Sequence, residues 1–214
     1  MKKWSLLILA LVLTFSLGNA AFAADDAVGV TVYAEYASDD GTAEGPTLGL
    51  DWEVTDQFVA QFSYQFEGDD DDAGDPINLG TFSIGGEYSF LEYWAASLTY
   101  ELTDDDATTT LGLSGSYPIT DPLSVAASLE YGITNYDQSG IDDTKAWTWN
   151  GGLDYQALEA LSVSLHYELE HEESASEDSK TAILGAEYAF DPFAVYGEYE
   201  FDPKTITVGV SYSF

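Results

Sequence analysis

Residues 161–170 of the chain, Leu161-Ser162-Val163-Ser164-Leu165-His166-Tyr167-Glu168-Leu169-Glu170, carry an apolar side chain at every second position. Successive side chains of a β-strand point to opposite faces, so this alternation predicts a strand with one apolar and one polar face. An amphipathic helix would instead space its apolar residues three or four positions apart. The stretch therefore favours β-structure over a helix.

The same alternation recurs along the rest of the chain and resolves it into twelve segments. The predicted spans are 27–37, 46–55, 57–67, 78–90, 93–103, 108–118, 122–133, 146–156, 160–170, 181–190, 193–201 and 205–214. Ten residues at about 3.3 Å each, tilted by roughly 40°, cross about 25 Å, the height of the apolar band of a transmembrane barrel. We predict an all-β fold: a closed antiparallel up-and-down transmembrane β-barrel of about 12 strands, with ten or fourteen as alternatives.

The connections between these segments alternate in kind. The longer, mostly acidic ones are Ser38 to Gly45, Gly68 to Pro76, Asp104 to Ala107, Thr134 to Lys145 and His171 to Lys180, and none exceeds about a dozen residues. The short ones are centred on Thr55-Asp56, Leu91-Glu92, Thr120-Asp121, Leu158-Glu159 and Asp191-Pro192. The sixth long connection departs, being only Asp202-Pro203-Lys204. Short turns on one rim and longer loops on the other are typical of transmembrane barrels, with the short turns on the periplasmic side.

The amino terminus has the composition of a signal peptide. Lys2 and Lys3 precede an apolar stretch that is shorter than the roughly 20 residues of a membrane-spanning helix, and Ala21-Phe22-Ala23 has the small residues of a cleavage site. We therefore predict a signal peptide over residues 1–23 and one barrel domain over 24–214.

The charge of the chain limits its partners. Beyond residue 23 the chain has 39 acidic residues and three basic ones, Lys145, Lys180 and Lys204, which gives a formal charge of −36. Nucleic acid is excluded as a partner because phosphate binding needs the opposite sign. The chain has no cysteine, which excludes disulfides and thiolate metal sites. We predict no cofactor and no metal site, because the acidic run 69–75 lacks the ligand spacing of a calcium loop.

Inside the segments, all thirteen acidic residues occupy the positions that alternate with the apolar side chains. They therefore lie on the opposite, polar face of each strand, which we call its polar phase. Together with His166 they form the predicted pore lining: Glu35, Asp51, Glu53, Glu67, Glu87, Glu101, Glu130, Asp154, His166, Glu168, Glu170, Glu187, Glu198 and Glu200. A secreted β-sandwich would also expose a polar phase, but to bulk water. Aromatic residues near segment ends, such as Trp94, Trp147 and Tyr188, favour a barrel with aromatic girdles at the membrane interfaces.

A short repeat, Gly-x-x-aromatic-x-apolar, closes five of the six even-numbered segments. The five copies are Gly49, Trp52, Val54; Gly85, Tyr88, Phe90; Gly152, Tyr155, Ala157; Gly185, Tyr188, Phe190; and Gly209, Tyr212, Phe214. With this repeat the chain resembles bacterial outer-membrane β-barrels of the porin type. The resemblance implies that Thr207, Gly209, Tyr212 and Phe214 form the carboxy-terminal signal read by the barrel-assembly machinery. It also implies an outer-membrane location, with lipid around the barrel.

The expected function is passive diffusion of ions or small hydrophilic solutes through an acidic lumen that prefers cations. The chain has no arginine, so it departs from the general trimeric porins with their basic constriction, and a monomer is favoured. Adaptation to salt is an alternative reason for the acidity.

The sequence is also compatible with two other functions. A structural or surface-display barrel would be plugged by lumen side chains, with Tyr33, Gln61, Gln65, Tyr196 and His166 as the candidates. A hydrolase would need a histidine beside a nucleophile, and His171 lies near Ser174 and Ser176. No serine motif supports catalysis, so no catalytic residue is predicted.

Overall fold

The computed structural model describes residues 29–39, 42–66, 80–103, 105–136, 143–173, 175 and 178–214. Among these residues, no helix is long and apolar enough to cross a membrane. The predicted signal peptide, residues 1–23, lies outside the described residues, and its cleavage stays a prediction.

The described chain folds into twelve β-strands. They are β1 (Val30–Asp39), β2 (Thr42–Thr55), β3 (Phe58–Gln65), β4 (Thr81–Leu91), β5 (Trp94–Leu102), β6 (Asp106–Thr120), β7 (Leu123–Tyr136), β8 (Thr144–Leu158), β9 (Leu161–Glu172), β10 (Ser179–Phe190), β11 (Phe193–Glu200) and β12 (Thr205–Ser213). Each corresponds to one predicted segment, so the predicted number of strands is confirmed.

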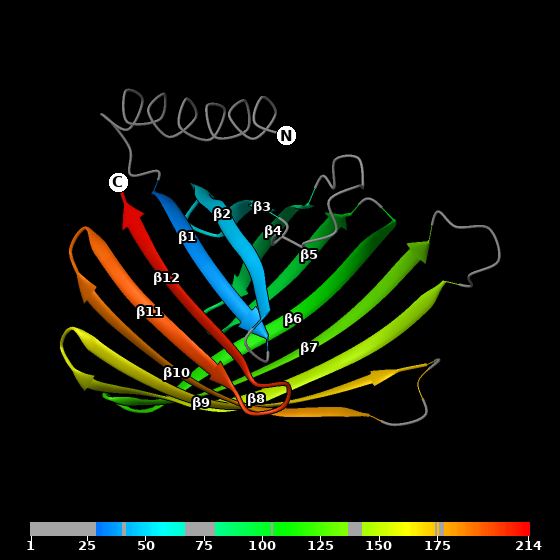
Figure 1. The fold of residues 1–214 in the computed structure, drawn as a ribbon. Coiled ribbons are helices and arrows are strands. Elements are labelled where there is room, and N and C mark those ends of the chain that lie inside the picture. Colours follow the sequence, from blue (N-terminus) through cyan, green and yellow to red (C-terminus); the bar gives the residue numbers. More distant parts are fainter. Residues whose placement is uncertain are drawn as a thin grey trace.

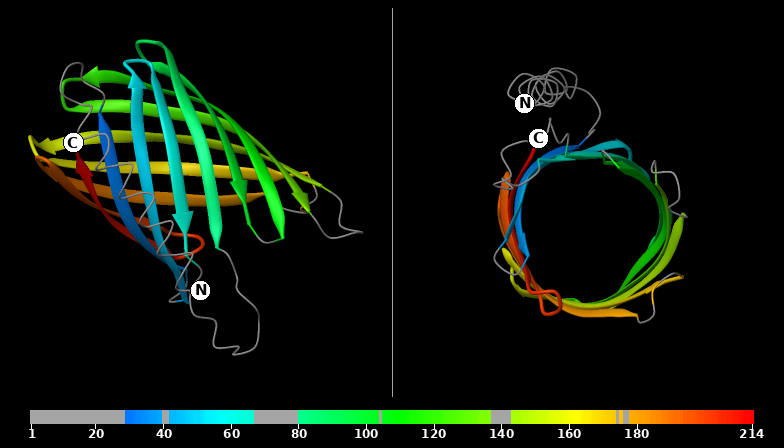
Figure 2. Two further views of the ribbon diagram at one scale, coloured as in Figure 1. Left: turned by 90° about the horizontal axis from the view of Figure 1, so that it is seen from above. Right: turned by 45° about the vertical axis from the view of Figure 1, so that its right-hand side comes forward.

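The strands close into a barrel in chain order. Each pairs antiparallel with its sequence neighbours, and β1 pairs with β12 to complete the ring. Figure 1 shows the barrel from the side, and the right-hand view of Figure 2 shows the ring of strands seen nearly end on. At the junction the hydroxyl groups of Thr31 and Ser213 lie 2.9 Å apart, and the backbone N–H of Phe214 donates to the carbonyl of Val30 at 2.9 Å. The predicted up-and-down barrel is confirmed.

The two rims differ as the alternation of connections predicts. Five two-residue turns, at 56–57, 92–93, 121–122, 159–160 and 191–192, lie on one rim together with residues 29 and 214, the ends of the described chain. The strand ends that the other connections join, such as Gln65 and Thr81 or Tyr136 and Thr144, lie on the opposite rim. We refer to these as the short-turn rim and the long-loop rim.

The prediction of a loop from Ser38 to Gly45 is wrong, because β1 and β2 continue pairing through this region. Ser38 pairs with Ala43 and Asp39 with Thr42, which leaves only residues 40–41 between the strands. A bulge interrupts the register next to Gly45, whose φ of 95° is accessible to glycine without strain. The glycine that resembled a loop signal instead absorbs one extra residue inside the hairpin.

The predicted limit of about a dozen residues per loop is also wrong. β3 ends at Gln65 and β4 begins at Thr81, so 15 residues separate the two strands. Gly80, directly before β4, has a φ of 70°, and an added side chain there would meet the carbonyl oxygen of Gln65. This left-handed residue stops the extended backbone that the period-two pattern had continued to residue 78.

The apolar side chains face outward rather than into a core. Among the described residues only two hydrophobic side chains, Val30 and Leu50, are buried, whereas 34 large ones are exposed. Such a surface would aggregate in water but is the expected surface of a protein solvated by lipid.

Candidate pore

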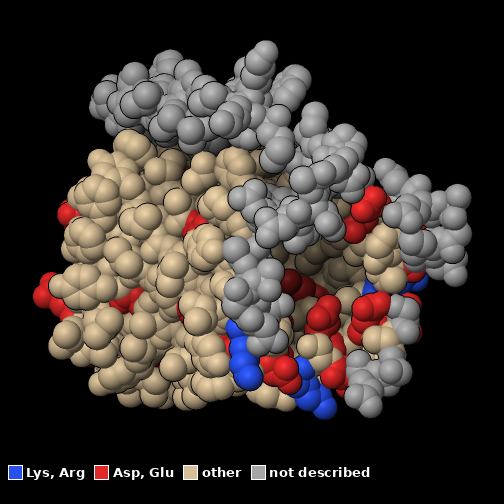
Figure 3. Space-filling model, in the orientation of Figure 1, with Lys and Arg blue, Asp and Glu red and all other residues tan. Residues whose placement is uncertain are grey.

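The two faces of each strand separate the outside of the barrel from its inside. On β8, Trp149 is 54 % exposed and Leu153 46 % exposed, whereas Asn150, Gly152 and Asp154 between and beside them are half-buried. Side chains in a closed barrel alternate between the inside and the outside, so the polar phase lines the lumen. Figure 3 shows the wall nearest the viewer as mostly uncharged, with acidic side chains gathered in and around the opening at the right.

Exposed aromatic side chains concentrate towards both rims of the outer face. Towards the short-turn rim they include Tyr88, Phe90, Trp94, Tyr117, Tyr155, Tyr188, Phe190, Phe193 and Phe214, and towards the long-loop rim Tyr36, Phe82, Tyr100, Trp147, Trp149, Tyr167 and Phe201. Between them lie aliphatic residues such as Leu98, Leu111, Leu165 and Val208. An aliphatic band between two aromatic girdles matches the interior and the two interfaces of a bilayer.

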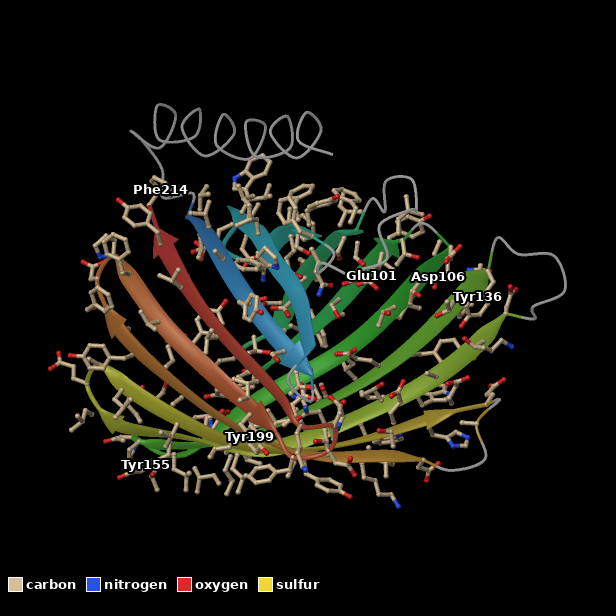
Figure 4. The ribbon with its side chains drawn as sticks, viewed as in Figure 1. Glu101, Asp106, Tyr136, Tyr155, Tyr199 and Phe214 are labelled. Carbon is tan, nitrogen blue, oxygen red and sulfur yellow. The ribbon has the colours of Figure 1, made fainter. Side chains whose placement is uncertain are left out.

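Twelve of the thirteen predicted lining acids lie on the described strands, all on the inward phase, and Glu67 lies outside the described residues. Four of them, Glu53, Glu87, Glu130 and Glu170, belong to one row of paired residues that runs from β2 to β9. In Figure 4, Glu101 lies close to Asp106 at the long-loop ends of β5 and β6, while Tyr155 and Phe214 mark the opposite rim. The inward carboxylates are thus distributed over most of the strands.

Three of these carboxylates form an acidic group near the β1–β2 side of the lumen. The charge of Asp51 on β2 is within electrostatic range of Glu35 on β1 and Glu87 on β4, and Asp51 accepts a hydrogen bond from Gln61. Glu35 accepts a hydrogen bond of 2.6 Å from the hydroxyl group of Tyr196 on β11. This bond spans β12, which lies between β1 and β11 in the barrel. We call Glu35, Asp51 and Glu87 the acidic trio.

A recess of about 370 Å³ opens in the wall on the other side of Tyr196, which lines it. Asp154, Glu187 and Glu198 line it from β8, β10 and β11, together with Ser164 and the small residues around Gly185. A side chain at Gly185 would collide with the hydroxyl group of Ser164 on β9, so the glycine lets this serine lie against the wall. The described residues contain no group of three or more potential ligands arranged to hold a metal ion.

The repeated glycines provide space for large inward side chains on the neighbouring strands. The ring of Tyr33 lies over Gly49 and the ring of Tyr196 over Gly209, each in the position that a Cβ atom on the glycine would occupy. In both cases the two residues are paired directly across neighbouring strands. In these two copies of the repeat the glycine therefore lets a tyrosine ring lie against the wall, which the spacing alone did not reveal.

His166 is held by two partners on the adjacent strand β8. Its Nε2 lies 2.9 Å from Oδ1 of Asp154 and its Nδ1 lies 3.1 Å from Oδ1 of Asn150, while its ring lies over Gly152. Sequence reasoning placed His166 and Asp154 in the lumen but missed Asn150. The polar phase of residues 146–156 contains both partners, and only the register between β8 and β9 reveals that they flank the histidine.

His171 lies on the outward phase at the long-loop end of β9. Its Nδ1 is 2.8 Å from Oδ1 of Asp178, and among the described residues no hydrogen bond joins either histidine to a serine hydroxyl. Ser174 and Ser176 lie outside the described residues.

The residues of the predicted assembly signal lie on β12 and at the end of the chain. Thr207 and Gly209 are on the inward phase, whereas Tyr212 and Phe214 continue the outward phase, with their rings 4.6 Å apart. Their recognition by the assembly machinery stays a prediction.

A family model for Gram-negative porins matches residues 12–205, which is most of the chain. The chain belongs to the Gram-negative porin family. As a porin it is an outer-membrane β-barrel channel for small solutes, and this membership favours a non-enzymatic role. The sequence has no significant match among curated proteins.

Solved structures with the same fold are distant in sequence. The NanC porin is 12 % identical, with a TM-score of 0.64, and the match covers 86 % of this chain and 98 % of that one. The KdgM porin is 19 % identical, with a TM-score of 0.62 and coverages of 86 % and 99 %. The translocator domain of the autotransporter NalP from Neisseria meningitidis is 13 % identical, with a TM-score of 0.57 and 98 % of both chains covered. At these identities the similarity concerns the fold.

Proposed function

We propose that this porin is a cation-preferring channel for ions and small hydrophilic solutes. The observation that carries the proposal is the segregation of charge on the strands: the described acids of the strands lie on the inward phase, and the two strand lysines, Lys145 and Lys180, lie on the outward phase. Carboxylates on a low-dielectric wall create a negative potential that concentrates cations and excludes anions.

The preferred solute should differ from that of at least one structural neighbour. The KdgM porin has been solved in complex with disordered oligogalacturonate, a chain of negatively charged sugars. An acidic wall without lumen lysines or arginines would repel such a polyanion. We therefore expect metal cations, organic cations and small neutral solutes to pass more readily.

A plugged barrel is the competing proposal, because Tyr33, Tyr196 and His166 are large inward side chains. Each of these three rings lies over a glycine of a neighbouring strand and therefore occupies space at the wall. This arrangement favours a conducting barrel over a plugged one, although Gln61 and Gln65 also lie on the inward phase.

Planar bilayers with purified protein distinguish the two proposals. In a KCl gradient we expect unitary currents and a reversal potential on the cation-selective side. Absence of any unitary current would favour the plugged barrel. A reversal potential of the opposite sign would refute the role given to the carboxylates while leaving a channel in place.

A further inference from the structure

The outward face of the barrel carries positive charge in only one region. The described outward side chains of the twelve strands include no Asp or Glu, and the lysines among them are Lys145 and Lys180. Each occupies the second position of its strand, β8 or β10, at the long-loop rim. Lys204 is exposed directly before β12, and His171 is the penultimate residue of β9. We call the three lysines, Lys145, Lys180 and Lys204, the cationic arc, and His171 on β9 lies between the first two of them along the rim.

The cationic arc follows one side of the rim. It extends from β8 to β12, which are consecutive in the barrel. In Figure 3 the basic side chains lie along the lower and right-hand edges of the opening, which is the long-loop rim of Figure 1. No described lysine lies on β1 to β7, so the barrel presents different charge to the membrane on its two sides.

An apolar surface lies directly on the membrane side of the arc. Lys180 shares a row of paired residues with Leu169 and Trp149, and His171 pairs with Trp147. Trp149 is 54 % exposed and Trp147 is 38 % exposed, so both rings are available for contact. One step further from the rim, a side chain added at Gly151 would meet no atom within 4 Å, so the outer surface is open beside the tryptophans.

Four exposed acids, Asp143, Glu173, Asp178 and Asp202, lie close to these lysines along the chain, but none of them is an outward side chain of a strand. Nζ of Lys145 is 4.0 Å from Oε2 of Glu173, and about half of each side chain is exposed, so the pair is weak and its lysine can take another anion. Among the described residues Lys180 forms no ion pair. A ligand with several negative charges would therefore find at least two lysines able to bind it.

We propose that the cationic arc binds the phosphate groups of a phosphorylated lipid in the outer leaflet, with the acyl chains of that lipid lying over Trp147, Trp149 and the open surface at Gly151. Longer loops face the extracellular side in barrels of this type, which places the arc at the level of outer-leaflet headgroups. Lysines at a membrane interface bind anionic headgroups while tryptophans lie at the same depth. This site lies on the outside of the barrel and does not depend on conduction through it.

The experiment compares two lipids that differ only in their phosphates. Full-length protein in neutral detergent is titrated with lipid A and with dephosphorylated lipid A, and bound lipid is counted by native mass spectrometry with and without EDTA. We expect tighter binding of the phosphorylated form. Replacing Lys145, Lys180 and Lys204 with glutamine should weaken that binding by about fivefold per lysine, or roughly a hundredfold in total.

Three controls make the result decisive. A variant with arginine at the same three positions should retain binding, and a variant with the acidic trio changed to amides should bind lipid A as tightly as the wild type. If the triple glutamine variant fails to fold by heat-modifiable gel mobility, Lys180→Gln alone provides the comparison. Equal binding of the two lipids would overturn the proposal, as would binding that EDTA abolishes but lysine replacement leaves unchanged, which would indicate divalent cations held by the acidic loops.

Discussion

Neutralising the acidic trio should reduce cation selectivity by an amount that the barrel geometry predicts. The perturbation is the triple substitution Glu35→Gln, Asp51→Asn and Glu87→Gln, which preserves side-chain shape. Glutamine at position 35 can still accept the hydrogen bond from Tyr196. The change therefore removes three charges and little else.

The magnitude follows from the distance between the wall and the axis. Twelve strands about 4.8 Å apart and tilted by about 40° give a backbone radius of about 12 Å, and a carboxylate reaching about 4 Å inward lies about 8 Å from the axis. One charge at that distance changes the energy of a monovalent ion on the axis by about 0.5 kcal/mol in water, which screening at 0.1 M salt lowers to about 0.2 kcal/mol. Three charges contribute about 0.7 kcal/mol, or about threefold in cation concentration.

Anions change by the same factor in the opposite direction, so the cation-to-anion permeability ratio should fall about tenfold at 0.1 M salt. At 1 M salt the screening length is about 3 Å, and the change should be less than about twofold. Reversal potentials in planar bilayers at both salt concentrations measure these ratios.

A matched control removes three charges from the short-turn rim with Glu92→Gln, Asp121→Asn and Glu159→Gln. This control should leave the ratio close to that of the wild type. Unchanged selectivity in the trio variant at 0.1 M salt, or an equal change in the control, would refute the assignment of selectivity to the trio.

Four further predictions concern the lipid face, the wall, pH and assembly. Leu111→Arg, in the middle of the aliphatic band, should lower the free energy of unfolding in lipid by about 2–4 kcal/mol, whereas Thr110→Arg on the inward phase should cost much less, as urea titration of reconstituted protein can measure. Gly49→Val should destabilise the barrel by about 1–3 kcal/mol through collision with the ring of Tyr33, and Tyr33→Ala should restore stability in a heat-modifiable gel assay; failure of that rescue would contradict the packing described above. Cation selectivity should decrease as the pH falls, because protonation neutralises carboxylates, and a reversal potential that stays constant from neutral to acidic pH would exclude them as its cause. Deletion of Phe214 should reduce the amount of folded barrel in the outer membrane, judged by surface protease protection, without changing the amount secreted.

The strands could be predicted from the sequence because the alternation of apolar and polar side chains is visible within each single strand. Residues 161–170 show the alternation without reference to any partner, and the structure has β9 over Leu161–Glu172. The same reasoning explains the two-residue turns, where alternation stops for only a few positions. Each strand has lipid on one face and water on the other. Apolar and polar side chains must therefore alternate along it, which strengthens the pattern in the sequence.

Features that depend on the register between neighbouring strands could not be predicted from the sequence. The pattern identified Gly49 and Gly209 as members of a repeat, but the reason for the glycines appears only when Tyr33 and Tyr196 are found opposite them. The partner Asn150 of His166 was missed for the same reason. The prediction of a loop over 38–45 was wrong because the pairing of β1 with β2 continues to Asp39 and Thr42, which only the register reveals.

The pairing of β1 with β12 imposes an order on biogenesis. Thr31 and Ser213 meet although 182 positions separate them in the chain, so this contact carries the largest chain-entropy cost in the barrel and forms only after the last residues have been made. A truncated product would retain two open sheet edges, which are templates for aggregation. Chaperoning during export must therefore protect an unfinished sheet until its final strand arrives.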